Sequence, residues 1–199
     1  MNKKELAAIQ MKQRVIEKTI ELFGTKGPIE FSAAMLSKEV GASKGALYHH
    51  FENLDAVKLA ALQSLIDSFM YTGAEEKPSY PSLEAYLTDI GEQVFYLMEQ
   101  EPVKVKAMLA FVQQAVFEPV FQEKVRKLFQ HSLAQYSEVV RYLFPDLSDK
   151  QITAAVQIID AHLGGTMLHW YLLNTPEQCR ENWRSFCRIF CNSIAQGVV

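Results

Sequence analysis

The sequence of 199 residues contains few of the features that mark membrane, secreted or metal-binding proteins. No apolar run approaches the roughly 18–20 residues that a helix needs to cross a bilayer, and the charged N-terminus lacks the apolar core of a signal peptide. The three cysteines, Cys179, Cys187 and Cys191, form neither an even disulfide set nor a CxxC metal motif. These absences favour a cytoplasmic protein with reduced thiols and no membrane partner.

Patterns typical of catalytic sites are also missing. Neither paired carboxylates nor a nucleophile–base spacing is present, so we expect no enzyme, no cofactor and no metal site. Cys187 and Cys191 lie four residues apart, which leaves a redox sensor or half of a metal site as an alternative. Both lie on an apolar helix face and nothing completes a metal set, so packing is the favoured interpretation.

Apolar residues recur with the 3.6-residue period of helices, and strand patterns are essentially absent. The chain is therefore predicted to be all-α, with about nine helices and a clear break at 73–82, where Pro78 and Pro81 lie. The expected helices are 4–26, 33–40, 43–51, 53–71, 83–100, 102–118, 119–144, 149–173 and 176–199.

The segment from Phe31 to Phe51, FSAAMLSKEVGASKGALYHHF, carries the most specific pattern. It predicts two short helices joined by a tight turn at Gly41, the arrangement that sets one helix into a DNA major groove. Ser32 and Ser43 are the expected N-caps of the two helices. The segment therefore predicts a DNA-binding head.

This pattern resembles the TetR family of bacterial transcriptional regulators. The similarity runs from about Val15 to about Leu62 and includes VIEKTIELFGTKG, the turn at 40–43 and KGALYHHF at 44–51. It implies a helix-turn-helix three-helix head, a C-terminal helical bundle for ligand binding and dimerisation, and a dimer face on the last two helices. The family usually has a lysine where this chain has Leu54, so that phosphate contact does not carry over.

The residues expected to face DNA lie at the starts of the two short helices. Lys44 can reach a phosphate or a guanine edge, and small side chains beside it let the helix approach the groove. The resemblance implies that Tyr48 and His49 bind phosphates or base edges, although Tyr48 is also compatible with a core position. Lysines 3, 4 and 12 are candidates for an N-terminal arm on the DNA backbone. The predicted DNA-binding residues are Ser32, Ala33, Ser43, Lys44, Gly45, Ala46, Tyr48 and His49.

The charge distribution is compatible with this head. Residues 1–53 contain eight Lys/Arg and six Asp/Glu, whereas 54–199 contain twelve and seventeen. A weakly basic head on an acidic body orients the head toward phosphates. We therefore predict a DNA-binding domain at 1–53 and a ligand-binding and dimerisation domain at 54–199, with the helix at 53–71 connecting them.

Two further sets of residues are predicted in the body. Large apolar side chains, with a histidine to orient polar groups, suit an effector pocket: Phe95, Met98, Met108, Phe111, Phe121, His162, Met167 and Trp170. A glycine pair and an apolar stripe suit close helix packing across a dimer: Gly164, Gly165, Trp183, Phe186, Cys187, Phe190, Cys191 and Ile194.

A single head would bind DNA weakly, whereas two heads about 34–36 Å apart across a dyad read a palindromic operator. The sequence therefore predicts a homodimeric, sequence-specific repressor of transcription that a small, largely apolar effector releases from double-stranded DNA. The alternative is a helix-turn-helix regulator without an effector, controlled by a protein partner or by its abundance. A helical enzyme is a remote third interpretation.

Overall fold

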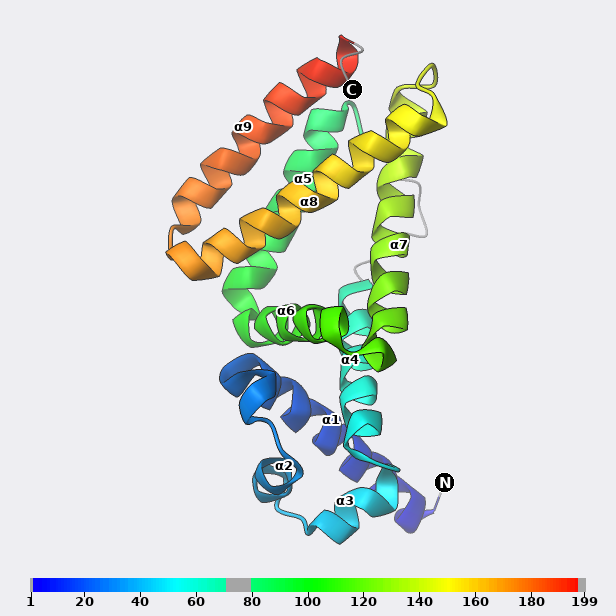
Figure 1. The fold of residues 1–199 in the computed structure, drawn as a ribbon, viewed down its shortest axis with the longest axis vertical. Helices are drawn as coiled ribbons and strands as arrows, with labels where there is room; N and C mark the ends of the chain where they lie inside the picture. Colours follow the sequence, from blue (N-terminus) through cyan, green and yellow to red (C-terminus); the bar gives the residue numbers. More distant parts are fainter. Residues whose placement is uncertain (1, 71–79, 197–199) are drawn as a thin grey trace. The chain divides into compact units, whose positions relative to one another are not determined.

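The computed structural model describes residues 2–70 and 80–196, and every regular element within them is a helix. The all-α prediction is confirmed. No helix in these ranges combines the length and apolar character that a membrane span requires. The helices shown in Figure 1 are α1 (Lys3–Glu30), α2 (Ala33–Val40), α3 (Lys44–His50), α4 (Leu54–Met70), α5 (Leu83–Gln100), α6 (Pro102–Phe117), α7 (Pro119–Leu143), α8 (Asp149–Leu173) and α9 (Pro176–Ala195).

Side-chain caps and prolines set the helix ends close to where the sequence predicts them. Ser148 and Gln151 form a capping box at the start of α8, in which each side chain bonds the backbone N–H of the other residue. Asn53 caps α4 through a 2.8 Å hydrogen bond from the backbone. Pro102 and Pro119 open α6 and α7, where a missing N–H costs nothing. The predicted loop at 73–82 and the predicted ends of the fourth and ninth helices lie partly outside the described residues.

The first helix breaks where its end was predicted. Gly27 leaves helical geometry, with φ 74° and ψ 173°, and the following residues make one further turn that α1 includes. The left-handed φ favours glycine because a Cβ would be strained there. This redirection places Phe31 in the core, where it is 8% exposed.

The described residues fall into two compact units, each built from two separate parts of the chain. The first unit comprises 2–70 with Gln100–Leu128, and the second comprises 80–99 with Phe129–196. Helices α4 and α6 thus pack with α1–α3, and α7 contributes residues to both units. The functional boundary predicted between residues 53 and 54 stays a prediction, because compactness alone does not assign function.

In the first unit α6 packs very closely on α1. Phe23 of α1 stacks on Phe111 of α6, with ring centroids 4.3 Å apart and planes 13° apart. Next to this stack, a Cβ added to Gly24 would lie 2.1 Å from the backbone oxygen of Val103. Only glycine permits this close approach. Helix α6 therefore packs directly on α1, against which α2 and α3 also pack.

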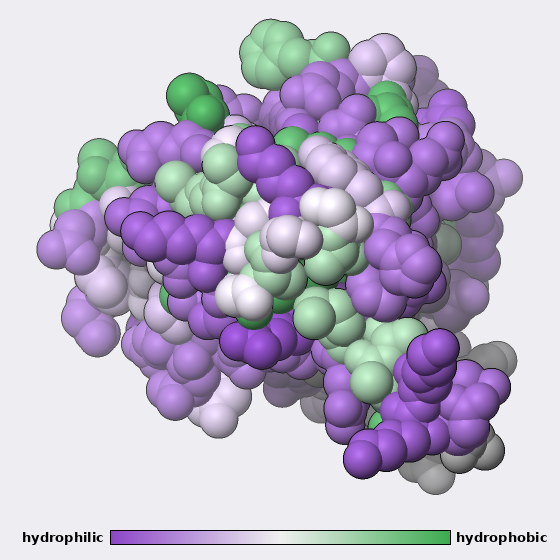
Figure 2. All heavy atoms as spheres, turned by 90° about the horizontal axis from the view of Figure 1, so that it is seen from below, coloured by the Kyte–Doolittle hydropathy of each residue, from purple (hydrophilic) through white to green (hydrophobic). Residues whose placement is uncertain are grey.

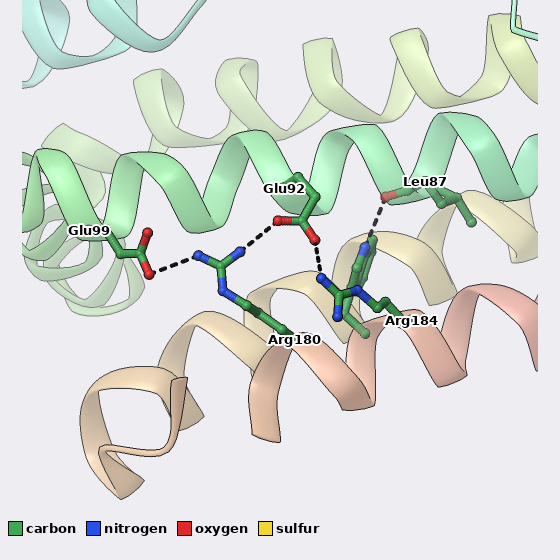
Figure 3. Close-up of polar contacts among 6 residues, drawn as sticks. Leu87, Glu92, Glu99, Arg180 and Arg184 are labelled. Carbon is green, nitrogen blue, oxygen red and sulfur yellow. Dashed lines mark hydrogen bonds and ion pairs between the residues drawn. The ribbon is translucent and has the colours of Figure 1, made fainter. Parts of the chain in front are cut away.

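In the second unit Trp183 of α9 anchors that helix to α5. Its indole lies against Gly91, where an added Cβ would be 2.0 Å from Nε1. The same Nε1 donates a 2.9 Å hydrogen bond to the backbone oxygen of Leu87 (Figure 3). This bond satisfies the buried indole N–H. A buried donor without a partner would destabilise the fold.

Ion pairs extend the α5–α9 contact along both helices. Arg180 donates to Glu92 at 2.6 Å and to Glu99 at 2.8 Å, and Arg184 donates to the other oxygen of Glu92 at 2.9 Å (Figure 3). The Arg180 side chain is only 14% exposed, so water screens this pair less than a surface ion pair. The network thereby fixes the register of α9 on α5.

Candidate nucleic-acid interface

Helices α2 and α3 form the predicted helix-turn-helix. Ser32 Oγ accepts a hydrogen bond from the backbone N–H three residues on at 3.3 Å, and Ser43 Oγ does the same at 3.1 Å. Both expected N-caps are present, and each serine hydroxyl keeps its O–H for a phosphate. Gly41 closes α2 in the left-handed region, with φ 72° and ψ 34°.

Burial separates the residues that hold α3 in place from those that face solvent. Leu36 and Leu47 are 0% and 1% exposed, whereas Tyr48 is 43% exposed. Tyr48 is therefore a surface residue, which excludes the core alternative. Lys44 and His49 are exposed as well, so α3 presents its polar side outward.

The start of α3 leaves space for a close partner. Nothing lies nearer than 3.8 Å to a Cβ added at Gly45, and the nearest atom belongs to the capping Ser43. Ala46 and Ala33 are partly buried and offer only methyl groups. Figure 2, which looks at the protein from below the view of Figure 1, shows a mostly hydrophilic surface with pale and green, less polar areas among it.

Two further positions of the first unit are the charged Arg14 and the apolar Leu54. Arg14 of α1 reaches the turn, where its guanidinium lies 3.9 Å from a Cβ added at Gly41. No sequence signal distinguishes this arginine, because α1 carries charged residues along its whole length. Leu54 packs against the core of the first unit, so this position is used for packing rather than for charge.

Residues 15–61 match the family described as bacterial regulatory proteins, tetR family. These residues, which include α2 and α3, therefore form a DNA-binding segment of the TetR family type. The curated regulator YerO of Bacillus subtilis (strain 168), described as an uncharacterized HTH-type transcriptional regulator, is 32% identical over 87 residues. That match covers 42% of this chain and only 30% of YerO.

Solved structures share the fold over nearly the whole chain. A transcriptional regulator from Rhodococcus sp. Rha1 is 22% identical with a TM-score of 0.77, covering 94% of this chain and 96% of that one. The multidrug binding protein EbrR, complexed with imidazole, is 19% identical with a TM-score of 0.69, covering 92% and 90%. At these identities the likeness establishes the TetR fold alone.

The structure divides the residues of the predicted effector pocket between the two units, and the pocket itself stays a prediction. Met108, Phe111 and Phe121 belong to the core cluster of the first unit and are at most 8% exposed. In the second unit Phe95 stacks on Trp170 at 5.4 Å, and the Arg180 guanidinium lies over both rings. Met98 is buried and Met167 is half-buried. Most of these side chains therefore fill core space.

His162 lies in an aromatic stack, and its buried Nε2 has no hydrogen-bond partner among the described residues. Its ring lies 4.0 Å from Phe186 and 5.8 Å from Trp183. Burial, and next the nearby His169, lower the pKa of His162 below its ordinary value. The surroundings of this imidazole thus disfavour its charged form.

The predicted dimer stripe on α9 is largely covered within its own chain. Trp183, Cys187, Phe190 and Ile194 are at most 5% exposed, because they pack inside their own unit. The other two residues of the stripe, Phe186 and Cys191, are half-buried. A partner cannot use side chains that the chain itself covers.

Of the last two helices, α8 carries most of the exposed large apolar side chains. A Cβ added at Gly164 or Gly165 would meet no heavy atom of the described chain within 4 Å. The glycine pair therefore serves no close packing inside the chain, and its predicted role between two copies remains a prediction. Large apolar side chains exposed on α8 and α9 are Ile158, Leu168, Leu172, Leu173 and Ile189.

The cysteine pair on α9 has the chemistry of packing residues. Burial raises the pKa of Cys187 to about 12 and that of Cys191 to about 11. Protonated thiols are poor nucleophiles and poor metal ligands at pH 7. Among the described residues, no cluster of three or more His, Cys, Asp or Glu could hold a metal ion.

Proposed function

We propose that this TetR-family regulator is a homodimeric repressor, released from a palindromic operator by a small, largely apolar effector. The observation that carries the proposal is the capped α2–α3 hairpin. Buried Leu47 holds α3 in place, while Lys44, Tyr48 and His49 stand outside. This arrangement offers cationic and hydrogen-bonding groups to phosphates and base edges.

Dimerisation follows from the small size of this reading surface. One short recognition helix makes few contacts, whereas two copies across a dyad double them. The open face of α8 around Gly164 and Gly165, with exposed Leu168 and Leu172, offers apolar surface that a second copy can bury.

The α1–α6 contact supports a route from an effector to the head. Because α6 is tightly joined to α1 at Gly24, a shift of α6 moves the scaffold of α2 and α3. An effector that binds more tightly to the arrangement that does not fit the operator lowers the affinity for DNA. A tenfold loss of DNA affinity needs a difference of about 1.4 kcal/mol in effector binding free energy between the two arrangements. EbrR, solved with imidazole and with ethidium, is a protein of this fold that holds small molecules.

The test compares two double variants of the full chain. Lys44→Ala with Tyr48→Ala removes groups of the reading surface. The control, Lys150→Ala with Tyr142→Ala, removes the same residue types from exposed positions of the second unit. An operator is first selected from random double-stranded DNA with the wild-type protein, and binding is then measured by fluorescence anisotropy across a salt series.

We expect the first variant to lose at least tenfold in affinity and its salt slope to fall by about one. The control should bind as the wild type does, and circular dichroism should show equal helix content in all three proteins. Full salt-sensitive binding by the Lys44/Tyr48 variant would overturn the assignment of the recognition helix.

A further inference from the structure

A surface pocket of the first unit is lined by residues from the end of α1, from α4 and from the end of α6. Its volume is about 320 Å³, at the lower end of the range in which proteins hold small molecules. None of its residues belongs to the predicted effector pocket. The lining includes Pro28, Ile29, Lys58, Gln114, Phe117 and Glu118, all of which lie in the first unit.

Two large apolar side chains of this lining stand in water. Ile29 is 98% exposed and Phe117 is 79% exposed. They come from different parts of the chain, and both line the same pocket. A ligand with an apolar group would remove surface of both from water, which favours its binding.

One cation and one anion line the pocket without pairing with each other. The Lys58 side chain is only 14% exposed, and its ammonium lies 3.3 Å from Asp55 and 5.6 Å from the centre of the Phe121 ring. An ammonium has three N–H donors, so the bond to one carboxylate leaves others for a ligand. Among the described residues no ion pair joins Lys58 to Glu118, so the two charges remain apart.

Gln114 holds the carboxylate of Glu118 in place. Its Nε2 donates a 2.8 Å hydrogen bond to Glu118 Oε1, and its side chain is 8% exposed. The Gln114 Oε1 is shielded from solvent and has no partner within the described residues, which is unusual for a buried polar atom. Gln114 therefore orients the carboxylate and does not itself contact a ligand. Glu118 makes no other side-chain bond in the described chain, so its second oxygen stays available.

We propose that this pocket binds a free amino acid with a large apolar or aromatic side chain. Lys58 pairs with the carboxylate of the ligand, Glu118 accepts hydrogen bonds from its ammonium, and the apolar side chains cover the rest. A zwitterion satisfies both charges of the pocket, whereas a ligand with a single charge leaves one of them unpaired. The site goes beyond the proposed function and does not rest on it, because its test needs no operator.

Three probes that share one phenyl ring test this charge pattern. L-phenylalanine carries both charges at pH 7, phenylpropanoate carries only the negative charge, and phenethylamine carries only the positive charge. Their binding to the full chain without DNA is measured by titration with NMR detection. We expect L-phenylalanine to bind about tenfold more tightly than either of the others, since each charge-assisted contact contributes about that factor. Equal binding of all three would overturn the proposal.

Two variants assign each charge of the ligand to its partner. Lys58→Met should weaken L-phenylalanine and phenylpropanoate about tenfold and leave phenethylamine no weaker. Glu118→Gln can still accept the bond from Gln114, and it should weaken L-phenylalanine and phenethylamine instead. The controls Lys127→Met and Glu123→Gln make the same changes at exposed positions of the same unit and should alter no probe. Equal losses in pocket variants and controls would overturn the site.

A measurement on the unmutated chain covers the case in which a variant misfolds. Azidophenylalanine keeps both charges and should photolabel peptides that contain residues 28–29 or 113–118, as mapped by mass spectrometry. An excess of L-phenylalanine should suppress this labelling. An equal excess of N-acetylphenylalaninamide, which resembles a residue inside a peptide chain, should not. Labelling confined to other peptides, or equal suppression by the two competitors, would overturn the proposal.

Discussion

The contact between α1 and α6 gives the sharpest prediction, which is that Gly24→Ala destabilises the protein. Alanine improves helix propensity by about 1 kcal/mol. Its methyl group, however, would lie 2.1 Å from the backbone oxygen of Val103 and 2.8 Å from its carbonyl carbon, where real contacts stay beyond 3.0 Å. Backbone atoms cannot rotate away, so α6 must shift from α1.

We place the cost of this overpacking near the upper end of the usual range, about 3 kcal/mol. The shift also loosens the stack of Phe23 on Phe111, which now has its centroids 4.3 Å apart. After the gain in helix propensity, the net loss in free energy of unfolding is about 2 kcal/mol. For a chain of 199 residues this corresponds to a fall in Tm of roughly 4–8 °C.

Thermal and urea unfolding, followed by circular dichroism, measure this loss. The double variant Gly24→Ala with Val103→Ala is the control, since it removes the Val103 Cγ1 at 2.8 Å and leaves the backbone oxygen in place. We expect no recovery in the double variant. A Gly24→Ala protein as stable as the wild type, or full rescue by Val103→Ala, would refute the argument from backbone contact.

Two further predictions concern the second unit. Gly164→Ala or Gly165→Ala should raise the dimer dissociation constant at least tenfold in sedimentation experiments, because the open space inside the chain leaves a partner copy as the close neighbour; an unchanged constant would place the interface elsewhere. Cys187 and Cys191 should resist iodoacetamide at pH 8 until the protein is unfolded, because burial raises the pKa of Cys187 to about 12 and that of Cys191 to about 11. Since the folded state holds these protons more tightly, the free energy of unfolding should fall as the pH rises from about 9 toward 11, as urea midpoints would show. Rapid alkylation of the folded protein at pH 8 would contradict this.

The helix ends were predictable because their signals are local. Ser32, Gly41 and Ser43 act within one turn of their own position, and the structure uses each of them as expected. The exposed side of α3 was predictable for the same reason, since Leu47 and Tyr48 lie on different faces of a short helix, one buried and one exposed.

The partners of apolar faces were not predictable from the same signals. A stripe such as that of α9 has the same pattern whether a second copy or the chain's own α5 covers it. Gly91 lets α5 cover the stripe, because it accommodates the indole of Trp183. This glycine lies 92 positions earlier in the sequence, so no local pattern on α9 reveals it. Phe111 was likewise assigned to a pocket, because nothing near it in sequence reveals the ring of Phe23.

The interleaved course of the chain through its two units has a consequence for folding and for dissection of the protein. A fragment that stops after α4 would contain the whole helix-turn-helix yet leave Phe23 without the ring that covers it, because Phe111 is synthesised some ninety residues later. The packing of α1 is therefore complete only after α6 has been synthesised. The early segment that carries α2 and α3 depends on a later one, and a cut between them divides the first unit.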